Sequence, residues 1–184
     1  MSYNDIRIVD AVDDINRKIF LPDIQREFVW DMDRIENLFD SIMLGYPIGT
    51  FLFWEVKEEH KKDWDIYEFI KDYDRSNPHN TIANMSGINR DVQLVLDGQQ
   101  RLTSLFIGLK GSYSYFYYRQ RKTNLYLNIL KPEIKNEENP EDPMYEFKFL
   151  EEGSVKNDNK SFWYKVERIL DFDDAEDAKK DISI

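Results

Sequence analysis

Val92-Gln-Leu-Val-Leu-Asp97-Gly98-Gln99-Gln100-Arg101-Leu-Thr103-Ser104-Leu-Phe106 is the stretch that decides how this chain folds. The apolar run of residues 92–96 predicts a buried strand. Asp97-Gly98 is a turn signal. A helical pattern follows at once, carried by Leu102, Leu105, Phe106 and Leu109. Residues 97–101 have no apolar side chain, so we expect a polar loop there, between a buried strand and a helix N-terminus.

Such a junction has a specific chemistry. The first N–H groups of a helix lack intrahelical partners and lie at the positive end of the helix dipole. That arrangement suits a phosphate or another anion. The competing interpretation is an ordinary turn that caps the helix, but Gln99, Gln100 and Arg101 have no evident folding role in such a turn. The junction therefore predicts a nucleotide pocket.

The composition limits the class of protein. The chain has 184 residues, which favours one domain with a real core. It has no cysteine, which excludes disulfides and thiolate metal sites and fits a reducing cytosol. A histidine-based catalytic or zinc centre is not expected, because the two histidines, His60 and His79, lie in a polar middle segment. No segment has the roughly 20 apolar residues of a membrane helix, so we expect a soluble, cytoplasmic protein that does not contact a membrane.

The net charge of −11 opposes non-specific DNA binding, because phosphates repel an acidic surface. Residues 131–184 contain 9 basic and 16 acidic residues, a net charge of −7. If DNA is a partner, the contact must be a local basic patch or belong to another domain.

Hydrophobic periodicity predicts an α+β fold. The clearest helix starts at the N-cap Asp31 and ends near Gly45. A shorter helix is expected at 10–18, followed by an extended segment that includes Pro22. Strands are expected at 50–56, 92–96, 112–118, 124–130 and 145–149, with a strand or the start of a helix at 162–170.

Residues 57–91 have no sustained period, and we interpret them as an insertion with little role in the core. A helix at 64–73 is one option within this segment. The acidic stretch 171–181 is expected to be a solvated surface or linker. The predicted division is therefore a core at 1–130 and a strand-rich extension with an acidic tail at 131–184. We expect that extension to lead into a further C-terminal domain.

Three motifs together resemble a known family. They are Leu21-Pro22-x-x-Gln25-Arg26-x-x-x-Trp30, Asp40-Ser41-Ile42-x-x-Gly45-Tyr46-Pro47-Ile48-Gly49 and Leu96-Asp97-Gly98-Gln99-Gln100-Arg101-Leu102-Thr103. In order and spacing they are similar to the N-terminal domain of GmrSD-type restriction endonucleases, type IV systems that cut modified phage DNA. The similarity covers about residues 5–130.

The resemblance implies a ParB/sulfiredoxin-like core, a small mixed sheet with flanking helices. Its Asp-Gly-Gln-Gln-Arg loop would bind and hydrolyse a nucleoside triphosphate with Mg²⁺ or another divalent cation. In full-length relatives an HNH-type nuclease domain follows, which the NTP-binding module would gate. The expected partners are therefore an NTP, modified DNA through the full-length protein and that nuclease domain, and a homo-oligomer is an open alternative. DNA cleavage by this chain alone is not expected.

The candidate catalytic residues are Asp97, Gln99, Gln100 and Arg101. Asp97 either binds Mg²⁺ or caps the helix. Gln99 and Gln100 either orient an attacking water or hold the segment of Gln25 and Arg26 in place. Arg101 either contacts a phosphate or forms a salt bridge to an acid such as Glu27.

The candidate nucleotide-binding residues are Gln25, Arg26, Gly98, Arg101 and Thr103. Helix-surface polarity is the competing interpretation for Thr103 and Ser104. The aromatic run 113–118 could stack on bases, but a sheet core explains it more simply. Two further functions stay open: a non-catalytic domain that senses DNA, and a ParB-like nuclease.

Overall fold

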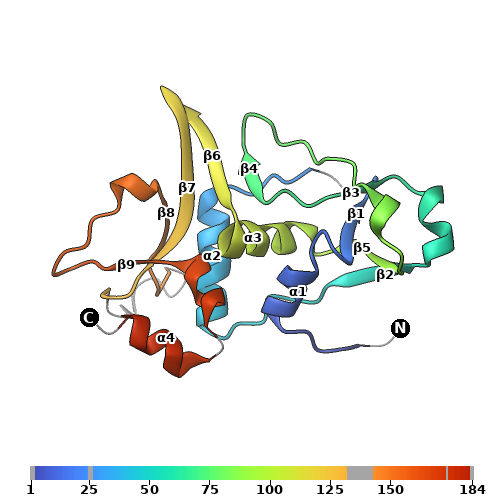
Figure 1. Ribbon diagram of the computed structural model, residues 1–184. Helices are drawn as coiled ribbons and strands as arrows, with labels where there is room; N and C mark the ends of the chain where they lie inside the picture. The colour runs from blue at the N-terminus through green and yellow to red at the C-terminus, as the bar shows by residue number, and fades with distance from the viewer. Residues whose placement is uncertain (1–2, 25–26, 132–142, 173, 183–184) are drawn as a thin grey trace.

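The computed structural model describes residues 3–24, 27–131, 143–172 and 174–182 (Figure 1). Its α-helices are α1 (Ile8–Asp14), α2 (Met32–Met43), α3 (Gln99–Lys110) and α4 (Ala175–Ile182). Short 3₁₀ helices are η1 (Glu58–Asp63), η2 (Met85–Gly87), η3 (Glu152–Ser154) and η4 (Val166–Asp171). None of the helices in these ranges is long and apolar enough to cross a membrane.

Two small sheets complete the fold and confirm the α+β class. The first has the order β2-β5-β1-β3, formed by β1 (Ile19–Pro22), β2 (Leu52–Val56), β3 (Ile66–Tyr67) and β5 (Val92–Asp97). The second has the order β4-β6-β7-β8, with β9 also paired to β7; its strands are β4 (Asp72–Asp74), β6 (Ser112–Tyr117), β7 (Arg119–Asn128), β8 (Phe147–Leu150) and β9 (Trp163–Lys165). Both sheets are mixed, since β1–β5 and β4–β6 are parallel and the other pairs are antiparallel. The likeness to ParB and sulfiredoxin stays a prediction.

Helix α3 lies between the two sheets (Figure 1). Ten of its twelve residues are buried, which is typical of a helix packed on all sides rather than along one stripe. Gly108 allows α2 to approach closely, because a Cβ at this position would lie 2.5 Å from Cε2 of Phe39. The helix that follows the decisive strand is therefore the centre of the core.

Helix α2 starts and ends where its sequence predicts. The Asp31 side chain accepts a hydrogen bond from Arg34 N at 3.1 Å, as an N-cap does. The helix stops before Gly45, which has a φ of +72° that favours glycine.

The segment 57–91 is not peripheral, and our expectation that it has little role in the core is wrong. Ile66, Phe69, Tyr73 and Ala83 are buried. The expected helix at 64–73 is also wrong: its apolar residues are spaced as in a helix, but the backbone pairs with neighbouring segments instead. Ile66 belongs to β3, which pairs with β1, and Tyr73 belongs to β4, which pairs with β6. Tertiary pairing has overridden the local pattern.

Two carboxylates of α2 attach the C-terminal part of the chain. Asp40 accepts a hydrogen bond from Tyr145 N at 2.7 Å, and Glu36 accepts one from Phe149 N at 2.9 Å. The expected strand at 145–149 is β8, and the segment 162–170 contains both a strand, β9, and the 3₁₀ helix η4. The acidic stretch 171–181 is not simply a linker, because it forms most of α4, where Ala178 is buried.

Glu36 makes the stability of the fold depend on pH. Burial raises the pKa of its carboxyl group from about 4.5 to about 7. Between these values the unfolded chain has lost the proton and the folded chain keeps it, so the free energy of unfolding falls as the pH rises through this window. Because Glu36 is partly exposed, solvent screening reduces the effect to about 1 kcal/mol.

We therefore expect Glu36→Gln, whose amide oxygen still accepts from Phe149 N, to match the wild type near pH 5 and to exceed its stability above pH 7. Urea unfolding at several pH values measures the difference. Glu152→Gln, at an exposed position of η3, is the control and should show no such trend. A constant offset between wild type and Glu36→Gln at all pH values would contradict the assignment.

Candidate functional site

A single residue, Gly98, joins β5 to α3. Asp97 is the last residue of β5 and Gln99 is the first of α3. The expected five-residue loop is therefore wrong in extent, because Gln99, Gln100 and Arg101 form the first helical turn. Gly98 has a φ of +91°, and a Cβ there would collide with the ring of Phe51, so glycine is required on both grounds.

Arg101 holds a turn of the chain that lies some fifty residues earlier. Its Nη1 donates to Ile48 O at 2.5 Å, and its Nη2 donates to Thr50 O at 3.0 Å and to the Asp97 carboxylate at 3.2 Å. Between the two carbonyls, Gly49 has a φ of +83°, and a Cβ there would lie 2.6 Å from Nη1. The guanidinium thus binds backbone carbonyls of residues 48–50, and within the described residues the expected salt bridge to Glu27 is not formed.

Gln100 holds a second segment. Its Oε1 accepts from Val29 N at 3.0 Å, and its Nε2 donates to Glu27 O at 3.0 Å. The amide therefore pairs with the backbone as a neighbouring strand would. Because the Gln100 side chain is buried, both of its groups need such partners. This is the holding role expected for a glutamine, and it acts on Glu27 and Val29, which follow Gln25 and Arg26 in the sequence.

Thr103 and Ser104 point into the core rather than to a surface. Thr103 is 1% exposed and Ser104 is fully buried. Their hydroxyl groups donate to the carbonyls of Gln99 and Gln100, one helical turn earlier. Neither of the two competing interpretations, a phosphate contact or surface polarity, describes this arrangement.

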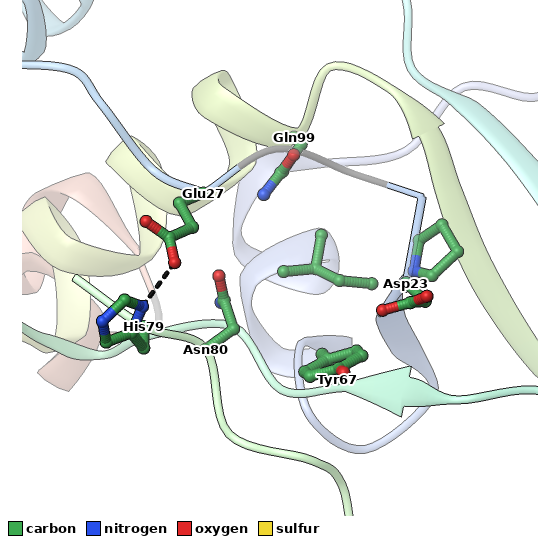
Figure 2. A pocket seen from close by; sticks show the side chains of 8 residues that line it. Asp23, Glu27, Tyr67, His79, Asn80 and Gln99 are labelled. Carbon is green, nitrogen blue, oxygen red and sulfur yellow. Dashed lines mark hydrogen bonds and ion pairs between the residues drawn. The ribbon is translucent and has the colours of Figure 1, made fainter.

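Gln99 faces a pocket of about 280 Å³ (Figure 2). The other residues that line it are Leu21, Pro22, Asp23, Glu27, Tyr67, His79 and Asn80. In Figure 2 the amide of Gln99 points from the start of α3 toward Glu27 and Asn80. The pocket therefore joins the start of α3, the end of β1, β3 and the loop that contains His79.

Two polar pairs shape the wall of this pocket. The carboxylate of Glu27 lies 2.5 Å from Nδ1 of His79. Burial raises the pKa of Tyr67, and a hydrogen bond to the carboxylate of Asp23 raises it further. The lining within the described ranges thus has two carboxylates and neither lysine nor arginine.

Sequence reasoning missed Tyr67, His79 and Asn80 as candidate residues. It placed them in an insertion, and no local pattern marks them. Tyr67 reaches the pocket through the pairing of β3 with β1, and the segment of His79 and Asn80 lies beside β3 through the hydrogen bond from Asn80 to Glu68 O and the Tyr67–Ile82 bridge. Gln25 and Arg26 lie outside the described residues. Asp23 and Glu27, the nearest described residues among the pocket lining, flank them in sequence.

The expected metal role of Asp97 has no support from its surroundings. Asp97 pairs with Arg101, its side chain is 70% exposed, and it is not part of the pocket lining. Within the described ranges, no group of three or more His, Asp or Glu side chains is arranged to hold a metal ion.

Comparison with known proteins gives two matches. Residues 8–183 match the family described as the N-terminal domain of the GmrSD restriction endonuclease. A 92-residue segment, half of the chain, is 41% identical to an uncharacterised protein of Methanocaldococcus jannaschii. That segment spans only 14% of the relative's length, so the relative is far longer than the shared part.

We expect Arg101→Ala to destabilise the fold by about 2–4 kcal/mol, because charge-assisted bonds to two backbone carbonyls are lost. Arg101→Lys should recover only part of this, since an ammonium lacks the planar fork. The urea midpoint measures both. Arg7→Ala, which removes an exposed pair with Asp10, is the control and should hardly change the midpoint. Equal urea midpoints for Arg7→Ala and Arg101→Ala would contradict the stabilising role of the Arg101 hydrogen bonds.

Proposed function

Because the chain belongs to the family of GmrSD restriction endonuclease N-terminal domains, we propose that it binds and hydrolyses a nucleoside triphosphate with Mg²⁺. In the full-length protein this event would gate a separate nuclease domain that cuts modified DNA. The observation that carries the proposal is the pocket at the start of α3, where Gln99 meets Asp23 and Glu27. Residues from two of the three sequence motifs lie next to the same cavity.

The start of α3 supports binding of a polyphosphate. Its N-cap, Gly98, has no side chain to occupy the first N–H groups of the helix. These groups lie at the positive end of the dipole of a twelve-residue helix. The Gln99 amide adds a donor and an acceptor that point into the pocket (Figure 2).

The carboxylates make a divalent cation a requirement of this proposal. Asp23 and Glu27 would repel a polyphosphate, and the described lining has no lysine or arginine to offset them. Mg²⁺ is commonly held by one or two carboxylates together with substrate phosphates, and Asp23 and Glu27 fit that donor set. When bound, Mg²⁺ would supply charge neutralisation at the transferred phosphoryl group.

The remaining residues then have defined roles. Gln99 would orient a water molecule by hydrogen bonding, as glutamines do in other NTPases. Gln100 and Arg101 act as positioning residues, because they tie Glu27, Val29 and residues 48–50 to the same helical turn. A ligand that moves this turn would move both segments, which offers a physical route for gating.

Calorimetric titration of the chain with ATP and with GTP, in Mg²⁺ and in EDTA, tests the proposal. We expect binding in Mg²⁺ only, weakened at least tenfold by Gln99→Ala. Gln93→Ala, in β5 and outside the pocket lining, is the matched control. Phosphate release from the bound nucleotide is the second readout. Equal nucleotide affinity in Mg²⁺ and in EDTA, or an affinity unchanged by Gln99→Ala, would rule out this pocket as the nucleotide site.

A further inference from the structure

The hairpin formed by β6 and β7 projects beyond the helices (Figure 1). Its strands pair closely as far as Tyr117 and Arg119, with Tyr118 alone at the turn. Near its base, Tyr113 is buried and packs against the rings of Tyr73 and Phe149. The expected core role of the aromatic run is therefore correct for Tyr113.

The core explanation fails at the tip of the hairpin. Phe116, Tyr117 and Tyr118 are 68%, 57% and 88% exposed. The rings of Tyr117 and Tyr118 lie edge to face with their centroids 4.7 Å apart, and Cζ of Arg121 lies 5.5 Å from the Tyr117 ring centroid. The two exposed rings thus lie against each other, and the half-buried guanidinium of Arg121 supports the ring of Tyr117. Apolar side chains gathered at a projecting tip are costly in water unless they meet a partner.

The hairpin also lies in the basic part of an acidic chain. Residues 98–130 contain five basic residues and no acidic one, although the net charge of the whole chain is −11. Arg119, Arg121 and Lys122 lie on β7 within the hairpin. This is the local basic patch that DNA contact would require of so acidic a protein.

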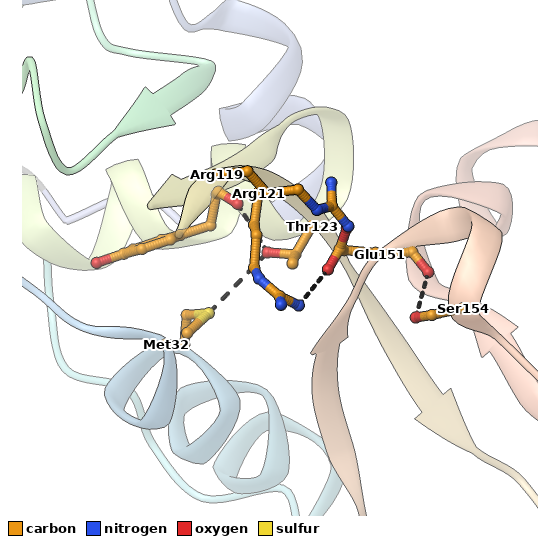
Figure 3. A network of polar contacts seen from close by, with 7 residues as sticks. Met32, Arg119, Arg121, Thr123, Glu151 and Ser154 are labelled. Atoms are coloured by element: carbon orange, nitrogen blue, oxygen red, sulfur yellow. Dashed lines mark hydrogen bonds and ion pairs between the residues drawn. The ribbon is translucent and has the colours of Figure 1, made fainter. Parts of the chain in front are cut away.

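Two carboxylates pair with these three cations. Arg119 and Arg121 share a single carboxylate, that of Glu151, at 2.5 and 2.6 Å (Figure 3). Lys122 pairs with Asp72 at 3.3 Å, and both of these side chains are more than half exposed. The side chains of Arg119 and Lys122 are 65% and 64% exposed, whereas Arg121 and Glu151 are more buried. Ion pairs of exposed cations contribute little to stability, so Arg119 and Lys122 can exchange their carboxylates for phosphate oxygens at small cost.

The turn residue carries a further sign of function. Tyr118 has a φ of +59°, a left-handed conformation that glycine or asparagine adopts more readily than a bulky residue. An exposed tyrosine here makes no described packing contact that would offset the strain beyond the ring of Tyr117. Strained exposed side chains of this kind occur at functional sites.

We propose that the tip of the β6–β7 hairpin binds DNA, with Arg119 and Lys122 on backbone phosphates and the rings of Phe116 and Tyr118 against bases. The proposal rests on the proposed function for the choice of DNA as the ligand, but not on the nucleotide pocket. Rings stack on bases of any sequence, and the positive charge follows the backbone. The hairpin therefore supplies contact with the strand and leaves recognition of the modification to other parts of the full-length protein.

Fluorescence anisotropy of a labelled DNA duplex, and of one of its strands alone, tests this with the 184-residue chain at 50–200 mM salt. Arg119→Gln/Lys122→Gln should weaken binding at least tenfold at 50 mM salt. It should also reduce the slope of log K against log salt by about two, one for each lost phosphate contact. The control Lys156→Gln/Lys160→Gln changes the net charge equally at exposed positions outside the hairpin and should leave affinity within about twofold.

A second pair of variants tests the rings. Phe116→Thr/Tyr118→Asn keeps a strand former and a residue that tolerates positive φ, so it should fold with an unchanged urea midpoint. We expect about fivefold or more weaker binding, with a larger loss on the single strand, whose bases are free to stack. Tyr3→Asn is the control, because Tyr3 is also 88% exposed but distant in sequence.

Absence of DNA binding by the wild type at 50 mM salt would overturn the proposal, as would equal losses in the hairpin and control variants. Light scattering measures whether the chain is monomeric or oligomeric in solution. If the hairpin substitutions change the oligomeric state and leave DNA affinity unchanged, the tip binds a second copy of the chain instead of DNA. Titration with ATP and Mg²⁺ should be the same for all hairpin variants. Loss of nucleotide binding alone would therefore count against the pocket and not against the hairpin.

Discussion

The architecture depends on how the first turn of α3 satisfies backbone groups from distant segments. Gln100 pairs with the N–H of Val29 and the carbonyl of Glu27, and Arg101 binds the carbonyls of Ile48 and Thr50. Backbone polar groups near a core need partners, and side chains can supply them where no neighbouring strand does. The side chains of one helical turn thus make the hydrogen bonds to these backbone groups that a neighbouring strand would make in a sheet. The three sequence motifs form one structural unit for this reason.

The same arrangement explains why the pocket lies where it does. With Gln100 and Arg101 committed to the backbone, Gln99 is the residue of this turn that faces the cavity. Its other walls come from the end of β1 and from the loop that pairs beside β3. The described lining is acidic, which makes a metal-bound polyphosphate a better match than a free anion. The residues that stabilise the fold and the residue that lines the pocket are therefore neighbours in one helical turn.

Charge is distributed in a way that separates two kinds of partner. The acidic majority of the surface repels nucleic acid, whereas the β6–β7 hairpin presents arginines, a lysine and exposed rings. Helix α3 ends where β6 begins, so the element that starts at the pocket leads directly into this hairpin. Under the proposed function, the buried helix α3 would connect a nucleotide bound at its start with DNA bound at the hairpin.

Elements that depend on local chemistry could be predicted from the sequence alone: α2 between Asp31 and Gly45, the order of strand, turn and helix around Gly98, and family membership through three ordered motifs. The sequence also marked Gln99, Gln100 and Arg101 as unusual, because no local folding role accounts for them. The packing of distant segments shows which of them binds backbone groups and which faces a cavity. In the folded chain, several side chains of residues 57–91 are buried in the core, His79 contacts Glu27 and Tyr118 is exposed to solvent. These outcomes depend on pairing between strands far apart in sequence, and local periodicity carries no information about such pairing.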